Sequence, residues 1–171
     1  MPRAITTSLA ALLLMNCAAE AEEPTSAQPA LAMTGRVVDA ANILSEAFED
    51  EMTEKLAALE AETGVQMVIA TTPDLEDRDI AAYSLDLANA WGIGSAERDD
   101  GLLLLIAPDQ RQARIEVGYG LEASVKDEEA ADILQNAVFP DFQNGNYEAG
   151  IAKGVERLVR EVTPYKLDKA A

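Results

Sequence analysis

The chain has 171 residues, of which 31 are Asp or Glu and 13 are Lys or Arg, so its formal charge is −18. This charge repels nucleic acid and anionic membrane surfaces and makes divalent cations the expected partners. His is absent and Cys occurs once, which excludes a Ser-His-Asp triad and argues against a zinc or copper site. The length suits a single domain with its own core.

An apolar stretch opens the chain. Arg3 precedes "SLAALLLMNCAA", which is too short to span a bilayer, and "AEA" at residues 19–21 offers a small-x-small cleavage site. We therefore expect residues 1–21 to be a secretory signal peptide and the mature protein to be periplasmic or secreted. Cys17 allows a lipoprotein signal as an alternative, but such signals usually carry Gly, Ala or Ser where this chain has Asn16, so simple cleavage is favoured.

The rest of the chain divides into a lead, one domain and a tail. Residues 22–34 mix Pro, Ser, Thr and Ala without a period, as a flexible linker does. The folded domain is expected over residues 35–163, and residues 164–171 form a polar tail. No second long apolar run follows the signal, so we expect no transmembrane helix in the mature chain.

Helical and strand-like periods then alternate. After the short apolar segment "VVDAANIL", Ser45 is a candidate N-cap for a helix that Gly64 ends. The run "VQMVIATT" (65–72) has the composition of a buried strand, and "DIAAYSLDLANAW" has helical spacing up to Gly92. The run "GLLLLIA" (101–107) is a second buried strand. This order predicts a βαβ unit with two parallel strands and a right-handed crossover.

The turn "PDQR" (108–111) then reverses the chain into "QARIEVG" (112–118), which predicts an antiparallel hairpin. Two more helices are expected, with Asp127 and Asn146 as their N-caps. Together these elements predict an α/β fold, a three-layer α/β sandwich with helices around a small, mixed, mostly parallel sheet that includes a β-hairpin.

The hairpin gathers acidic residues at one rim of the sheet. It places Gly101 opposite Gly118, so Asp99 and Asp100 converge on the segment from Tyr119 to Glu122. Carboxylates gathered in this way repel one another, and Ca²⁺, or alternatively Mg²⁺, would relieve the repulsion. From the charges alone, a loop whose carboxylates simply face water is the favoured interpretation.

A dinucleotide cofactor is not expected. The segment "GYGLEA" (118–123) fits a GxGxxA pattern after a strand, but Glu122 would lie inside the phosphate cradle, and the next helix begins only near Asp127.

Several long stretches resemble one family. They are "TGRVVDAANILSE", "ETGVQMVIATTP", "WGIGSAERDDGLLLLIAPDQRQARIEVGYGLEASVKDEEA" and "VFPDFQNGNYEAGI". Between about residues 35 and 162 the chain is similar to the TPM-domain family, which includes a thylakoid-lumen acid phosphatase linked to photosystem II repair. The resemblance implies an α/β sandwich that is exported or anchored outside the cytoplasm.

The resemblance also implies candidate site residues. Some relatives bind calcium or related ions in an acidic groove, and phosphatase activity is attributed to plant members. The resemblance implies that the ion-binding residues here are Asp39 of "RVVD", Asp99 and Asp100 of "RDDG", and Glu122 of "GYGLE". Only the resemblance assigns Asp39 to this set. The family's common Lys-Asp-Asn-Gly is Arg-Asp-Asp-Gly here (98–101), which adds a carboxylate.

Two functional hypotheses follow. The first is an exported Ca²⁺-binding module that assists the assembly or repair of envelope or membrane proteins. The second is a metal-assisted acid phosphatase, in which the four acidic residues hold a cation that activates water. Binding is favoured, because the sequence offers no nucleophile paired with a base.

Overall fold

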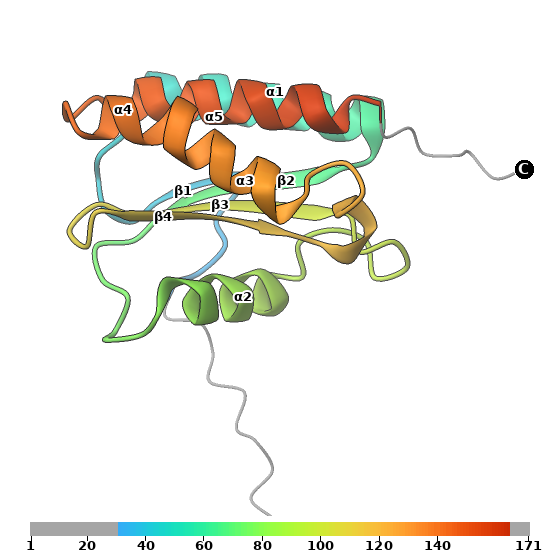
Figure 1. Ribbon diagram of the computed structural model, residues 1–171, viewed down its shortest axis with the longest axis horizontal. Helices are drawn as coiled ribbons and strands as arrows, with labels where there is room; N and C mark the ends of the chain where they lie inside the picture. The colour runs from blue at the N-terminus through green and yellow to red at the C-terminus, as the bar shows by residue number, and fades with distance from the viewer. Residues whose placement is uncertain (1–30, 165–171) are drawn as a thin grey trace, which may run out of the picture.

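The computed structural model describes residues 31–164 (Figure 1). The expected signal peptide, Cys17, most of the linker and most of the polar tail lie outside these residues. Within residues 31–164, no helix is long and apolar enough to cross a membrane.

A four-stranded mixed sheet forms the centre of the molecule, in the order β1-β2-β3-β4. Its strands are β1 (Val37–Asp39), β2 (Gln66–Thr71), β3 (Gly101–Ala107) and β4 (Gln112–Val117). The first three are parallel, and β4 runs antiparallel to β3. Both the βαβ unit and the hairpin predicted from the sequence are confirmed.

Helices cover both faces of this sheet, which confirms the predicted three-layer α/β sandwich (Figure 1). The helix α2 (Ile80–Trp91) lies alone on one face. The opposite face carries the remaining helical elements: α1 (Glu46–Thr63), α3 (Asp127–Ile133), the π-helical segment η2 (Leu134–Val138), α4 (Phe139–Phe142) and α5 (Tyr147–Val162). A short 3₁₀ turn, η1 (Tyr119–Leu121), follows β4.

The strand β3 is buried on both faces, which explains its unbroken apolar sequence. Leu102, Leu104 and Ile106 pack into the core beneath α1 and α5. Leu103 and Leu105 face the other way, into a smaller core with Tyr83 and Leu87 of α2. Each fully buried leucine contributes about 2 kcal/mol to the free energy of folding.

Most helix boundaries follow their predicted signals. The Ser45 hydroxyl accepts a hydrogen bond from the Phe48 backbone N–H at 3.3 Å, and Gly64 ends α1 in the left-handed conformation. Gly92 ends α2 in the same way. Two predicted caps differ. Lys126 occupies the N-cap position of α3, so Asp127 is the first helical residue. Asn146 holds the N-cap position of α5 but makes no capping hydrogen bond.

The helix predicted after Asp127 is interrupted by η2. Pro140 follows this segment and has no N–H to donate to the carbonyl four residues earlier, which favours a wider turn just before it. Sequence periodicity alone indicated a continuous helix here, since the apolar residues keep helical spacing through the π turn.

Candidate functional site

The hairpin brings Asp99 against the glycine-rich segment that follows β4. The Gly118 N–H donates to the Gly101 carbonyl and the Gly120 N–H to the Asp99 carbonyl, both at 2.9 Å. A Cβ on Gly118 would lie 2.2 Å from the Asp99 carbonyl oxygen, and one on Gly120 would lie 2.0 Å from that of Arg98. The glycines therefore permit a backbone approach that no other residue allows, and the predicted convergence of Asp99 on this segment is confirmed.

Asp99 is presented by an unusual backbone. Its φ of 50° lies in the left-handed region, where Asp is tolerated better than most residues. The Tyr119 N–H donates to one carboxylate oxygen of Asp99 at 3.3 Å. Asp99 is exposed, so its carboxylate keeps accepting capacity toward solvent.

A cavity of about 280 Å³ lies beside Asp99, between α2, β4 and the segment leading into α3. Glu122 and Asp127 also line it, and both are exposed. Neither of these two carboxylates accepts a hydrogen bond from any residue between 31 and 164. We call Asp99, Glu122 and Asp127 the acidic rim. The sequence predicted the first two, whereas it indicated only a helix cap at Asp127.

The wall of this cavity contains a polar chain that the sequence did not single out. Arg114 Nε and the buried Ser84 hydroxyl both donate to one oxygen of Glu116, each at 2.8 Å. Arg114 is thereby partly neutralised. The available signal was a pair of charged residues, two apart, on a strand whose alternate positions are apolar.

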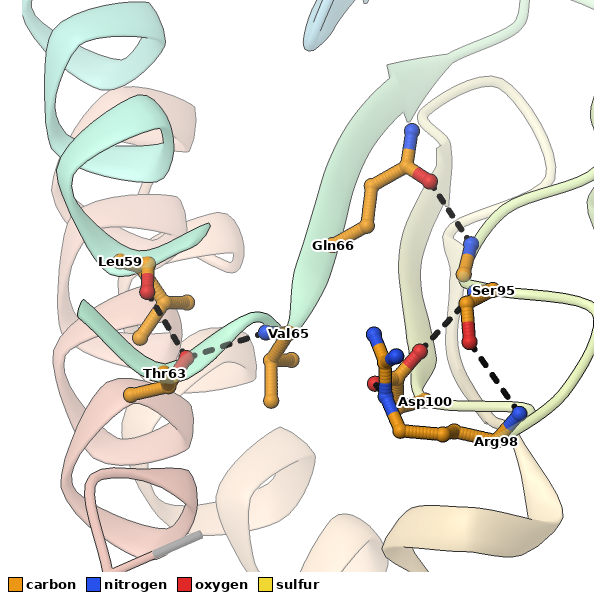
Figure 2. A network of polar contacts seen from close by, with 8 residues as sticks. Leu59, Thr63, Val65, Gln66, Ser95, Arg98 and Asp100 are labelled. Atoms are coloured by element: carbon orange, nitrogen blue, oxygen red, sulfur yellow. Dashed lines mark hydrogen bonds and ion pairs between the residues drawn. The ribbon is translucent and has the colours of Figure 1, made fainter. Parts of the chain in front are cut away.

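Asp100 has a different environment from its neighbour. Its side chain is completely buried, one oxygen accepts the Ser95 N–H at 2.9 Å, and the other pairs with Arg98 Nε at 2.5 Å (Figure 2). The Ser95 hydroxyl accepts the Arg98 N–H, and Gln66 receives the Gly94 N–H. Asp100 thus holds the loop before β3 together, while Gln66 attaches this loop to β2. Asp100 does not line the cavity.

Asp39 lies at the opposite end of the sheet. It pairs in register with Thr71, which pairs with Ile106, so it is five residues along the strands from Gly101, about 17 Å. Its two oxygens accept the Leu44 N–H at 2.9 Å and the Thr71 hydroxyl. The expectation that Asp39 shares one position with the other three acidic residues is therefore wrong, because one short strand gave no means of placing it.

Acidic residues also gather around Asp39 at the start of α1. Burial, followed by the charges of Asp39, Asp50 and Glu46, raises the pKa of Glu49 above its usual value. Across the whole described chain, however, no three acidic or other metal-ligating side chains lie close enough to hold an ion together. A cation at the acidic rim would therefore take most of its ligands from water.

The parallel strands with an antiparallel hairpin, the helical layers and the glycine-lined acidic rim define a three-layer α/β sandwich with a small mixed sheet. The TPM domain model matches residues 37–161, and the chain belongs to the TPM-domain family.

Solved structures show the same fold. The chain is similar to the N-terminal domain of a protein from P. gingivalis, with 34% identity, a TM-score of 0.71, and coverage of 78% of this chain and 85% of that one. A Corynebacterium glutamicum N-terminal domain has 17% identity, a TM-score of 0.58 and 88% coverage of both chains. The BA42 protein of Bizionia argentinensis has 18% identity and a TM-score of 0.63, over 72% of this chain and 83% of that one. No curated protein matches.

Proposed function

We propose that the protein is an exported, divalent-cation-binding TPM-domain module that takes one hydrated Ca²⁺ at the acidic rim. The observation that carries the proposal is the cavity that Asp99, Glu122 and Asp127 line, two of them without a hydrogen-bond partner in residues 31–164. Ca²⁺ accepts carboxylate, carbonyl and water oxygens in irregular geometry, which suits this sparse set. Mg²⁺ keeps more of its own water and would bind there more weakly.

The acidic rim would form a flexible Ca²⁺ site, because only one of its three carboxylates is held in place by the protein. Asp99 is the fixed member, since its backbone and the Tyr119 N–H hold it, while Glu122 and Asp127 are free to adjust. Such a site favours weak, reversible binding, in the range of extracellular calcium modules, about 10⁻⁴–10⁻³ M. That range suits a protein outside the cytoplasm, where it would assist the assembly or repair of envelope or membrane proteins.

The test is a calorimetric Ca²⁺ titration of residues 22–171 with Mg²⁺ as competitor. The wild type is compared with Asp99→Asn/Glu122→Gln and with Glu51→Gln/Glu54→Gln, a control that removes the same charge from an exposed face of α1. We expect saturable heat in the wild type and the control and none in the rim variant. Equal loss of heat in both variants would show that only the net charge matters.

The alternative, a metal-assisted acid phosphatase, has less support. Arg114 is the only basic side chain that lines the cavity within the described residues, and its pairing with Glu116 leaves little positive charge for a phosphate. An aryl phosphate hydrolysed faster by the wild type than by Asp99→Asn would favour this alternative over a purely binding role.

Export is part of the proposal and rests on the apolar N-terminal segment. Expression of the full chain in a bacterial host, followed by fractionation and mass measurement, tests it. The expected product lacks residues 1–21 and lies outside the cytoplasm, and a cytoplasmic product of full mass would contradict it.

A further inference from the structure

A second, larger cavity lies at the other end of the sheet and has a different chemistry. Its volume is about 560 Å³, within the range of small-ligand pockets. It lies between the β3–β4 turn and the segment from α4 to the start of α5. These segments are at the left in Figure 1. The acidic rim is at the opposite end of β3, so the two cavities share no side chain.

One wall of the second cavity is aromatic. The rings of Phe139 and Phe142 meet edge to face with centroids 6.4 Å apart, and those of Phe142 and Tyr147 are 5.0 Å apart. All three side chains are only partly buried, so part of each ring remains open. The π-helical segment η2 immediately precedes Phe139, and such segments are common at functional sites.

Arg111 supplies positive charge to this aromatic cavity. It is exposed and lines the cavity, and it is the only arginine of residues 31–164 that forms no ion pair. In a chain where acids exceed bases by more than two to one, an arginine without a carboxylate partner is unusual. Its guanidinium is therefore available for an anion from outside the chain.

The position of Arg111 also costs stability. Its φ is 55°, in the last residue of the hairpin turn, where Gly or Asn is the ordinary choice and a long side chain is strained. The turn itself is closed by a hydrogen bond from the Arg111 N–H to the Pro108 carbonyl, which any non-proline residue would make. The arginine side chain is thus unnecessary for the turn, and a strained residue with an unpaired charge points to a function.

We propose that the second cavity binds the C-terminal residue of a peptide whose last side chain is aromatic or apolar. The side chain stacks on the Phe139, Phe142 and Tyr147 wall, and the terminal carboxylate pairs with Arg111. Gln112 and Gln143 also line this cavity and are exposed, and their amides suit the peptide group of the preceding residue. A single carboxylate is favoured over a phosphate dianion, because the total charge of −18 repels the latter more strongly.

The test compares the tripeptide Ala-Ala-Phe with its C-terminal amide by NMR titration of the protein in the presence of a chelator, so that the result is independent of the cation site. We expect shifts at Phe139, Phe142 and Tyr147 with the free acid, and binding about tenfold weaker with the amide. Equal affinity for acid and amide would overturn the proposal.

Two variants and a control separate binding from folding. Arg111→Gln should lose about tenfold in affinity for the free acid, and Arg160→Gln, which removes an exposed arginine from the last turn of α5, should lose none. Arg111→Gly should also lose affinity while raising the melting temperature by about 2–5 °C. Unchanged binding by Arg111→Gln would refute the role of the guanidinium. N-acetylphenylalanine binding as tightly as the tripeptide would refute a peptide as the ligand.

Discussion

Carboxylates near the ends of the sheet have two opposite roles. Asp39 and Asp100 each accept hydrogen bonds on both oxygens, and each holds a loop next to a strand in place. Glu122 and Asp127 accept none within the described chain, and Asp99 accepts one long bond. The number of donors that a carboxylate meets, rather than its place in an acidic motif, thus separates the structural acids from those free to bind a cation.

Asp99 and Asp100 show this contrast within one dipeptide. The left-handed backbone at Asp99 turns it toward Tyr119 and the cavity, while Asp100 points into the protein toward Ser95 and Arg98. A double substitution of both residues would therefore mix a loss of stability with a loss of binding. For this reason the rim variant above pairs Asp99 with Glu122.

Asp100→Ala is expected to have the largest effect on stability. The variant leaves the Ser95 N–H without its acceptor and Arg98 without its buried partner. We expect a loss of about 3 kcal/mol, at the low end for a broken buried pair because Arg98 is 38% exposed. Urea unfolding measures it, with Asp100→Asn as the milder control, since an amide oxygen still accepts the Ser95 N–H. A loss below about 1 kcal/mol would show that Asp100 does not fasten the loop.

Gly120→Ala is expected to have the next largest effect on stability. The added Cβ would lie 2.0 Å from the Arg98 carbonyl oxygen, so the backbone on one side of the rim must move. We expect a loss of about 2 kcal/mol together with weakened Ca²⁺ binding, measured by thermal unfolding and calorimetry. Gly145→Ala is an informative comparison, because nothing lies within 4 Å of its Cβ position and only its φ of 76° opposes the change. If Gly120→Ala retained full Ca²⁺ affinity, as Gly145→Ala should, the rim geometry would not matter for binding.

Thr71→Val tests the Asp39 end. It removes the hydroxyl that donates to Asp39 and accepts the Ala41 N–H, with little change in volume. The expected cost is about 1–2 kcal/mol of unfolding free energy, with no change in the Ca²⁺ titration, since this end is about 17 Å from the rim. Weaker Ca²⁺ binding by this variant would mean that the ion binds near Asp39 instead.

Glu49→Gln should have the smallest effect on stability, and it should stabilise the protein instead of destabilising it. Because the folded state raises the pKa of Glu49, its charged form costs stability once the pH exceeds that raised pKa, and the cost vanishes below the usual value of 4.5. We expect the variant to be more stable by about 0.5 kcal/mol at pH 7 and equal to the wild type at pH 4. Equal stability at both values of pH would contradict the raised pKa.

The sequence predicted the fold better than the site, for physical reasons. Strong periodicity and turn residues defined β2, β3 and the hairpin, and the hairpin register in turn placed Asp99 opposite Tyr119 and Gly120. Periodicity does not report the direction of a side chain in a loop, so the burial of Asp100 was not predictable. The three residues of β1 were too few to locate Asp39. Whether Arg111 has a carboxylate partner among residues 31–164 depends on which residues, distant in sequence, lie beside it in the fold.

The most direct test of the account is an NMR titration of residues 22–171 with Ca²⁺, following backbone amides at both ends of the sheet. A cation site at the acidic rim predicts saturable shifts at Asp99, at residues 119–122 and at Asp127, with residues 39–49 unchanged. Shifts confined to residues 39–49, or no saturable shift at either end, would contradict a cation site at the acidic rim.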